Sequence, residues 1–175
     1  MTTYEFTLRF ALPSTGTDMD AVADALYGGG CDDALVGIGR PGSVALDFTR
    51  AANSAREAVM GAISDVTRAL PGSTLTEVAP DLVGITDVAD IVGCTRQNIR
   101  QLMAFGSSRV PAPVREGRPT LWHLSSILNW LVEEKRYQVA AALLDLAETT
   151  MRVNLALSAI QAEPDLEDDL RALLA

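Results

Sequence analysis

Hydrophobic and polar residues alternate in the first 80 residues in a way that predicts short strands. From Tyr4 to Phe10 every second residue is apolar, which is the period of a strand with one buried face. Residues 44–48 alternate in the same way, and the turn sequence Arg40-Pro-Gly-Ser43 separates them from a second strand-like segment at 34–39. Residues 73–78 supply a fourth segment. The pattern therefore predicts four strands.

Two other segments of this region repeat their apolar residues every three or four positions, which is the period of a helix with one buried face. The first carries Met19, Val22, Ala23 and Leu26, and the second carries Ala55, Val59, Ile63, Val66 and Leu70. The order strand, helix, strand, strand, helix, strand is typical of the ferredoxin-like sandwich, so we expect residues 1–80 to form an α+β domain of this kind. Because that fold hosts ligand sensing, dimerisation and partner docking alike, it does not indicate a function.

Residues 84–104 follow a third pattern, in which two short helices meet at a glycine. Thr86 is placed to cap the first helix. The inward positions of that helix are Val88, Ala89 and Val92. Ala89 is small, which lets a second helix cross closely, and Gly93 permits the positive φ that ends a helix and turns the chain. These residues predict a helix-turn-helix.

The second helix of this pair is predicted to expose hydrogen-bond donors. Thr95 can cap it, and Ile99, Leu102 and Met103 form its buried stripe. The opposite face carries Arg96, Gln97, Asn98, Arg100 and Gln101. Arginine can bind guanine, and asparagine or glutamine can bind adenine, through two hydrogen bonds in the major groove. The same residue types also make an ordinary polar surface, but the caps, the small residue, the glycine and the donors together favour DNA binding.

The segment after these helices is predicted to form a basic wing. Two extended runs flank a Glu116-Gly117 turn, which is typical of a hairpin. Three arginines decorate it: Arg109, Arg115 and Arg118. A short helix over 123–131 then offers Ile127, Leu128 and Leu131 to pack under the hairpin. We therefore predict a winged helix-turn-helix over residues 84–132.

These residues also carry a resemblance to known families. The matching segments are Thr86-Asp-Val-Ala89, Gly93-Cys-Thr95-Arg-Gln-Asn-Ile99-Arg100, Pro111-Ala-Pro113-Val and Trp122 with Ile127-Leu-Asn-Trp130-Leu. They resemble the winged helix-turn-helix of mercury-resistance-type regulators and of the phage excisionase and prophage-regulator group. The whole chain also resembles a group of bacterial DNA-binding proteins with a small α+β domain in front of such a module.

The resemblance implies that the second helix enters the major groove and that Arg100 approaches the phosphate backbone. Gln101-Leu102 stands where the regulators usually have an aromatic pair. The long coiled coil that leads to their effector domain is also absent in its usual form. We therefore do not extend the inducer and metal chemistry of those regulators to this chain.

Residues 135–175 are predicted to form a C-terminal helical region. Apolar residues separated by steps of four and three form a seam, interrupted by the polar Thr150, and the seam predicts dimerisation. Its apolar members are Val139, Leu143, Leu146, Val153, Leu157 and Ile160. The alternative is a single amphipathic helix that folds back onto its own chain. After Pro164, a short acidic helix over 166–174 is expected to lie away from the wing.

The net charge of −9 argues against a nucleic-acid binder until its distribution is considered. Residues 86–131 contain five arginines and three acidic residues, so this region is positive while the remainder is strongly negative. DNA responds first to the local charge, because salt screens interactions beyond about 8 Å. A modest basic patch on an otherwise acidic protein predicts moderate affinity for DNA, so we expect two copies of the protein to bind together.

Other chemistries find little support in the sequence. Cys31 and Cys94 lie far apart without metal-ligand spacing, and both are expected to be small buried residues. The Gly28–Gly30 run follows a helix and lacks the residues of a phosphate loop. His123 is expected to cap, pack or touch a phosphate instead of acting in catalysis. We expect no enzyme activity, metal or cofactor, and with no apolar run near the ~20 residues of a membrane span, a cytoplasmic location.

Taken together, the sequence predicts a homodimeric transcription regulator that binds duplex DNA. The predicted DNA-binding residues are Thr95, Arg96, Gln97, Asn98, Arg100, Gln101, Arg109, Arg115 and Arg118. Two alternatives stay open. One is an antitoxin or adaptor whose winged domain docks a protein partner, and the other is a regulator whose N-terminal domain also senses a small-molecule effector.

Overall fold

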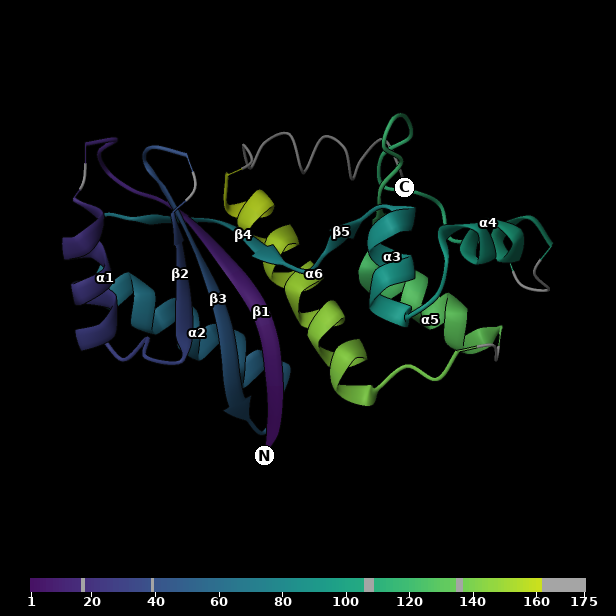
Figure 1. Ribbon diagram of the computed structural model, residues 1–175, viewed down its shortest axis with the longest axis horizontal. Coiled ribbons are helices and arrows are strands. Elements are labelled where there is room, and N and C mark those ends of the chain that lie inside the picture. Colours follow the sequence, from purple (N-terminus) through teal and green to yellow (C-terminus); the bar gives the residue numbers. More distant parts are fainter. Residues whose placement is uncertain (17, 39, 106–108, 135–136, 162–175) are drawn as a thin grey trace, which may run out of the picture.

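An antiparallel sheet of four strands forms one end of the molecule, and a group of short helices forms the other (Figure 1). The computed structural model describes residues 1–16, 18–38, 40–105, 109–134 and 137–161. The strands of the sheet are β1 (Thr2–Ala11), β2 (Ala34–Ile38), β3 (Ser43–Ala52) and β4 (Thr74–Ala79). Their order across the sheet is β2-β3-β1-β4. The fold is therefore mixed α+β, and the four predicted strands are confirmed.

The alternating residues of β1 and β3 build the core of this end. Phe6 faces Phe48 and Leu8 faces Leu46 across the two strands, and all four side chains are buried. The rings of Phe6 and Phe48 stack with centroids 5.3 Å apart. The helices α1 (Met19–Gly28) and α2 (Ala55–Ala69) supply the other buried residues of the same cluster. The apolar residues of the period-two pattern thus lie on one face of the sheet, which is buried against the two helices.

A second core lies under the short helices. It belongs to β5 (Leu82–Val83), α3 (Ile85–Val92), α4 (Arg96–Phe105), β6 (Trp122–His123) and α5 (Leu124–Glu133). The predicted inward residues Ile127, Leu128 and Leu131 are fully buried in it. The two short strands β5 and β6 pair with each other and join the start of this module to the end of the predicted wing.

The turn between α3 and α4 confirms one sequence prediction and corrects another. Gly93 ends α3 in the left-handed conformation, with φ 71° and ψ 38°, as its residue type predicted. The predicted cap Thr86 was wrong, because α3 begins at Ile85 and its N-cap is Gly84. The Asp87 carboxylate accepts a hydrogen bond of 2.8 Å from the Gly84 N–H and closes the helix end instead.

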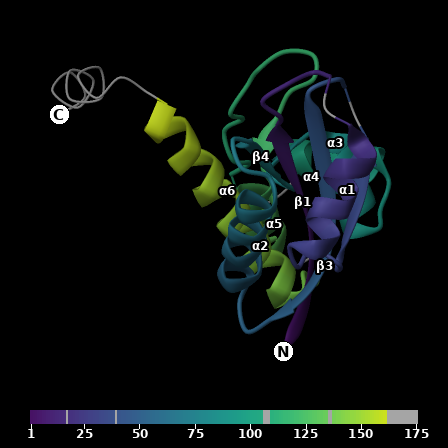
Figure 2. The same cartoon turned by 90° about the vertical axis from the view of Figure 1, so that its left-hand side faces the viewer.

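The long helix α6 (Ala141–Gln161) lies between the two cores and contacts both (Figure 1), and Figure 2 shows it beside α2. Leu146 belongs to the core under the sheet, whereas its neighbour Ala147 belongs to the core under the short helices. Asp145 accepts hydrogen bonds from the Tyr4 hydroxyl and from the Ala55 N–H at the start of α2. A carboxylate at that position is stabilised by the helix dipole.

The placement of α6 favours the alternative in which this helix folds onto its own chain. Four of the predicted seam residues pack inside the chain, namely Val139, Leu143, Leu146 and Val153. Leu157 is half-buried, and Ile160 is 80% exposed. Most of the predicted dimer seam is therefore occupied by the chain's own cores. The acidic helix predicted over 166–174 lies outside the described residues.

The segment that joins the two modules is fixed by hydrogen bonds from α6. Thr150 donates from its hydroxyl to the Pro80 carbonyl at 2.6 Å, which explains the polar interruption of the apolar seam. The Asn154 amide donates to the Val78 carbonyl and to the Asp81 carboxylate, and its oxygen accepts from the Val78 N–H. These bonds hold the connection between the modules in one position. Among the described helices, none is both long and apolar enough to cross a membrane.

Candidate nucleic-acid interface

The helix α4 presents its polar face outward because its apolar residues anchor it from below. Ile99 is fully buried and Leu102 is 6% exposed, so the opposite side of the helix faces solvent. The Thr95 hydroxyl accepts from the Asn98 N–H at 3.2 Å and fixes the start of the helix, as its sequence position predicted. The exposed residues of this face are Arg96, Gln97, Asn98, Arg100 and Gln101.

The wing after α4 is held by a few backbone hydrogen bonds. The Val114 N–H donates to the Leu121 carbonyl at 2.8 Å, and the Leu121 N–H donates to the Arg115 carbonyl at 3.0 Å. The indole N–H of the buried Trp122 donates to the Pro111 carbonyl at 3.1 Å. The predicted hairpin is thus short, with a single bridge between Arg115 and Leu121. Its tip projects above α3, with α4 farther to the right (Figure 1).

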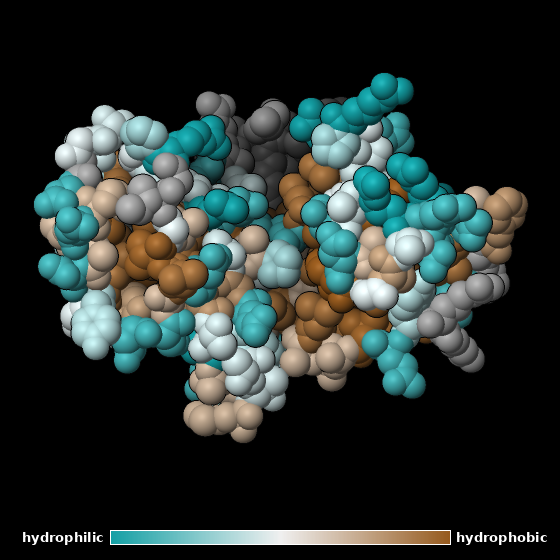
Figure 3. Space-filling model, in the orientation of Figure 1, coloured by the Kyte–Doolittle hydropathy of each residue, from teal (hydrophilic) through white to brown (hydrophobic). Residues whose placement is uncertain are grey.

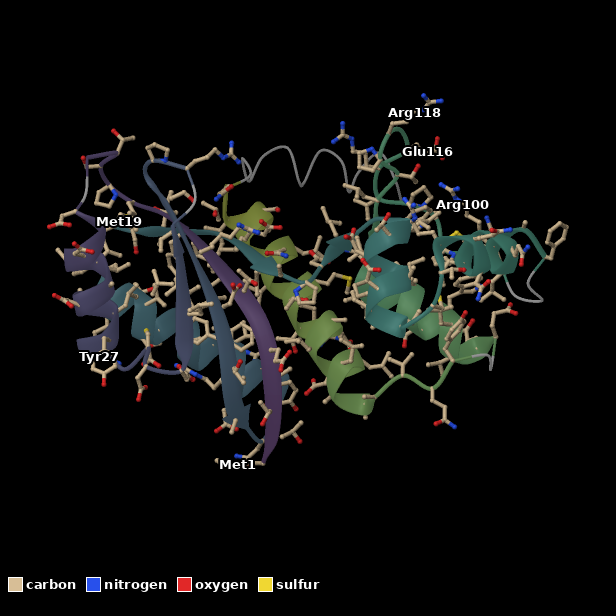
Figure 4. All side chains as sticks on the ribbon, viewed as in Figure 1. Met1, Met19, Tyr27, Arg100, Glu116 and Arg118 are labelled. Carbon is tan, nitrogen blue, oxygen red and sulfur yellow. The ribbon has the colours of Figure 1, made fainter. Side chains whose placement is uncertain are left out.

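The arginines of α4 and of the wing lie on one end of the molecule. Figure 4 shows Arg100 and Arg118 toward the same side, with Glu116 beside the latter. Arg96, Arg109 and Arg115 are also exposed. Within the part of the chain that the structure describes, none of these five arginines forms an ion pair. Their charges are therefore available to an anionic partner.

Four of the six described arginines outside α4 and the wing form ion pairs, whereas Arg40 and Arg56 do not. In the sheet module, Arg9 pairs with Glu77, and Arg50 bridges Asp33 and Asp65. The two carboxylates raise the pKa of Arg50 above its usual value, and burial opposes them in part. The unpaired arginines of α4 and of the wing thus differ from these structural arginines in chemistry as well as in position.

The C-terminal half of α4 is anchored by Leu102 and is open to solvent on its other side. A hollow of about 490 Å³ lies beside it, lined by Asn98, Gln101, Leu102, Phe105 and Tyr137. Phe105, at the end of the helix, is 85% exposed. The major groove of DNA, which is about 12 Å wide, admits an α-helix with an exposed polar face of this kind.

The nine predicted DNA-binding residues are all exposed, and they belong to α4, its cap and the wing. Thr95 is engaged as the cap. The alternative role of His123 as a phosphate contact is not supported, because its Nδ1 lies 2.7 Å from the Asp81 carboxylate and its side chain is 19% exposed. Sequence reasoning missed Phe105, whose apolar type predicts burial and not exposure at a helix end.

Other kinds of site find no support in the geometry. The described residues contain no group of three histidine, cysteine or acidic side chains placed to bind a metal ion. Cys31 is buried, as expected, and burial raises the pKa of its thiol, with a smaller contribution from Asp65. Cys94 is only half-buried.

Comparison of the chain with protein-family models, with curated proteins and with solved structures found no match. Function must therefore be inferred from the residues and their geometry.

Proposed function

We propose that this protein binds duplex DNA through α4 and the wing and acts as a sequence-specific transcription regulator. The observation that carries the proposal is a group of five exposed arginines without ion pairs. Two of them lie on α4 among three exposed amide side chains, and the other three lie on the wing. Such a surface matches the phosphates and base edges of DNA. Its local positive charge contrasts with a chain whose net charge is −9.

The arrangement of the elements supports the same assignment. The helices α3 and α4, the glycine turn between them, the wing and α5 follow one another as in a winged helix-turn-helix. The sequence resemblance to regulators that contain this module points the same way. In the sheet module, the antiparallel strand order β2-β3-β1-β4 with two helices supports the ferredoxin-like assignment.

We assign different roles to the two groups of polar residues. The amides of Gln97, Asn98 and Gln101, with Arg96, read base edges in the major groove. Arg100 and the wing arginines bind phosphates and fix the position of the module on the duplex. Because the patch is modest, two copies on adjacent half-sites about 34 Å apart would give useful affinity.

The phosphate-binding role is tested by a salt series. The purified protein is titrated into fluorescent random-sequence duplex, and Arg100→Ala and Arg115→Ala are compared with the unchanged chain. We expect each substitution to weaken binding roughly tenfold and to lower the slope of log K against log salt by about one. Arg152→Ala is the matched control, because this exposed arginine lies on α6 and pairs with Glu148 there. Equal losses in all three variants would contradict the assignment.

The base-reading role is tested by selection from a random duplex library. Asn98→Ala should change the preferred base at one position by about 1–3 kcal/mol and leave binding to random DNA nearly unchanged. Enrichment of an inverted repeat by the unchanged chain would support the regulator assignment. If the protein binds no DNA at low salt, the winged module serves a protein partner instead, as in an antitoxin or an adaptor.

A further inference from the structure

The outer end of α4 carries a large aromatic side chain in solvent. Phe105 is the last residue of the helix and is 85% exposed. In Figure 3 the surface over α4 is largely hydrophilic, with a pale-brown hydrophobic patch at its outer end. A phenylalanine stabilises a fold by being buried, so this one adds little to the stability of the described chain. Single exposed apolar residues are common, however, and a role for Phe105 requires a second observation.

The second observation is the position of Phe105 relative to two amide side chains. Asn98, Gln101 and Phe105 are separated by steps of three and four residues, which places them on one face of a helix. The structure agrees, because all three line the same hollow of about 490 Å³. They thus form one row along α4, with two polar members and an apolar member at its end.

A base-reading surface can use an apolar group at the end of such a row. Asparagine and glutamine bind adenine through two hydrogen bonds in the major groove. Adenine pairs with thymine, whose 5-methyl group is an apolar feature of the same groove. A phenyl ring cannot form these hydrogen bonds, but it can cover the methyl group. The row of Asn98, Gln101 and Phe105 therefore matches a site that contains A·T pairs.

We propose that Phe105 contacts the 5-methyl group of a thymine in the major groove and so helps to select the DNA sequence. The inference rests on the proposed DNA binding by α4 and adds a specificity-determining residue to it. Contact between the ring and the methyl group removes apolar surface of both from water. Cytosine carries no methyl group at this position, so it cannot provide the same contact.

The geometry of the helix predicts where this thymine lies. Phe105 follows Asn98 by seven residues, which is about 10 Å along the axis of α4. Successive base pairs are about 3.4 Å apart along the duplex. A helix that lies along the groove therefore places the thymine about three base pairs from the adenine bound by Asn98. The two positions are linked through the length of one helix.

The first experiment removes only the methyl group from the DNA. The site selected by the unchanged chain is synthesised with each thymine in turn replaced by deoxyuridine, which keeps every hydrogen-bonding group of the base. Fluorescence anisotropy gives the dissociation constants. We expect one replacement in each half-site to raise the constant about fourfold, because burial of one methyl-sized group contributes that much. This thymine should lie about three base pairs from the position whose base preference Asn98→Ala changes.

The second experiment removes the ring from the protein. Phe105→Ala should bind the thymine and the deoxyuridine duplexes equally, so the ratio of their dissociation constants should fall from about four to about one. Phe105→Leu keeps an apolar side chain and should retain a ratio of at least about two. Ile160→Ala is the matched control, because Ile160 is an apolar residue on α6 that is 80% exposed. It should keep the full ratio.

The outcomes separate this inference from the proposed function. An equal loss of affinity for every duplex with Phe105→Ala would mean that the ring packs on the sugar–phosphate backbone, and it would overturn the inference while DNA binding stands. An unchanged affinity in all the deoxyuridine duplexes would overturn it as well. A chain that binds no duplex contradicts the proposed function and the inference together. A melting temperature within about 2 °C of the original shows that Phe105→Ala is folded.

Discussion

The two edges of the sheet differ in whether another part of the chain forms hydrogen bonds with them. At the β4 edge, the Asn154 amide forms hydrogen bonds of 2.9 and 2.8 Å with both backbone groups of Val78, much as a neighbouring strand would. At the β2 edge, nothing in the described chain takes that position. One edge is thus closed by a side chain from α6, and the other is open.

The two edges also differ in what surrounds them. The closed edge lies next to the junction between the modules, where Asn154 also binds Asp81 and Thr150 binds the Pro80 carbonyl. Asp81 in turn contacts His123 at the start of α5. Closing this edge therefore also fixes the module of short helices relative to the sheet. The open edge lies away from the junction.

Asn154→Ala should have the largest effect on stability. It removes three hydrogen bonds and leaves the backbone groups of Val78 without partners. A buried polar group without a partner costs about 1–3 kcal/mol, so we expect a loss of roughly 3 kcal/mol in the free energy of unfolding. Urea denaturation at low protein concentration measures it. Ser158→Ala, one turn later on α6 and exposed, should change the value by less than about 0.5 kcal/mol.

Thr150→Val should have the next largest effect. The two side chains have nearly the same shape, so the change removes the hydroxyl of the fully buried Thr150 and leaves the carbonyl of the half-buried Pro80 without this partner. We expect a loss of about 1.5 kcal/mol. The same denaturation experiment measures it, and a neutral result would mean that water satisfies the carbonyl and that α6 does not fix the junction through this bond.

Tyr4→Phe should lower the free energy of unfolding at neutral pH by less than the two changes above, because it removes the hydrogen bond that the hydroxyl donates to Asp145 on α6. It should also change the response to alkali. Burial raises the pKa of Tyr4, and the Asp145 hydrogen bond adds to the rise. Burial likewise raises the pKa of Cys31, just before β2. The folded chain holds both protons more tightly than the unfolded chain.

The stabilising contribution of these two protonated groups is therefore complete at pH values below their ordinary pKa values of 9.0 for cysteine and 10.0 for tyrosine. It is lost as the pH rises through and beyond these values. Thermal unfolding between about pH 7 and 11 should show a decline that is shallower in Tyr4→Phe. Tyr27→Phe, at a tyrosine that is 75% exposed, is the control. An identical decline in both variants would contradict the assignment to Tyr4.

Leu35→Lys should have the smallest effect on stability. Its side chain is mostly in solvent, so we expect the free energy of unfolding, measured by the same urea denaturation, to change by less than about 0.5 kcal/mol. A large loss of stability would mean that β2 is supported by contacts inside the chain and that its edge is not open.

Local patterns predicted most of the individual elements. The period-two segments became β1 and β3, and the period-3.6 segments became α1 and α2, because a half-buried element must repeat its apolar residues at its own period. Gly93 and Thr95 likewise marked the turn and the cap of α4, since both act through their own backbone. The exposure of Arg96 and Arg100 also followed from spacing, because Ile99 and Leu102 fix the opposite face of α4.

The surroundings of α6 could not be predicted in this way. Its apolar seam fits a partner helix and the chain's own cores equally well, because periodicity gives the buried face of a helix and not what covers it. The polar residues Thr150 and Asn154 on the same helix gave no sign of their partners, which lie about 70 residues earlier in the sequence.

The sequence by itself determined the strands, the helices, the turn and the cationic face of α4, since each depends on neighbours within a few residues. Only the tertiary structure decided that α6 serves both cores, that Asn154 closes one edge of the sheet and that the edge of β2 is left open. Hydrogen bonds between distant segments depend on where the whole chain brings them, and residue spacing carries no record of that.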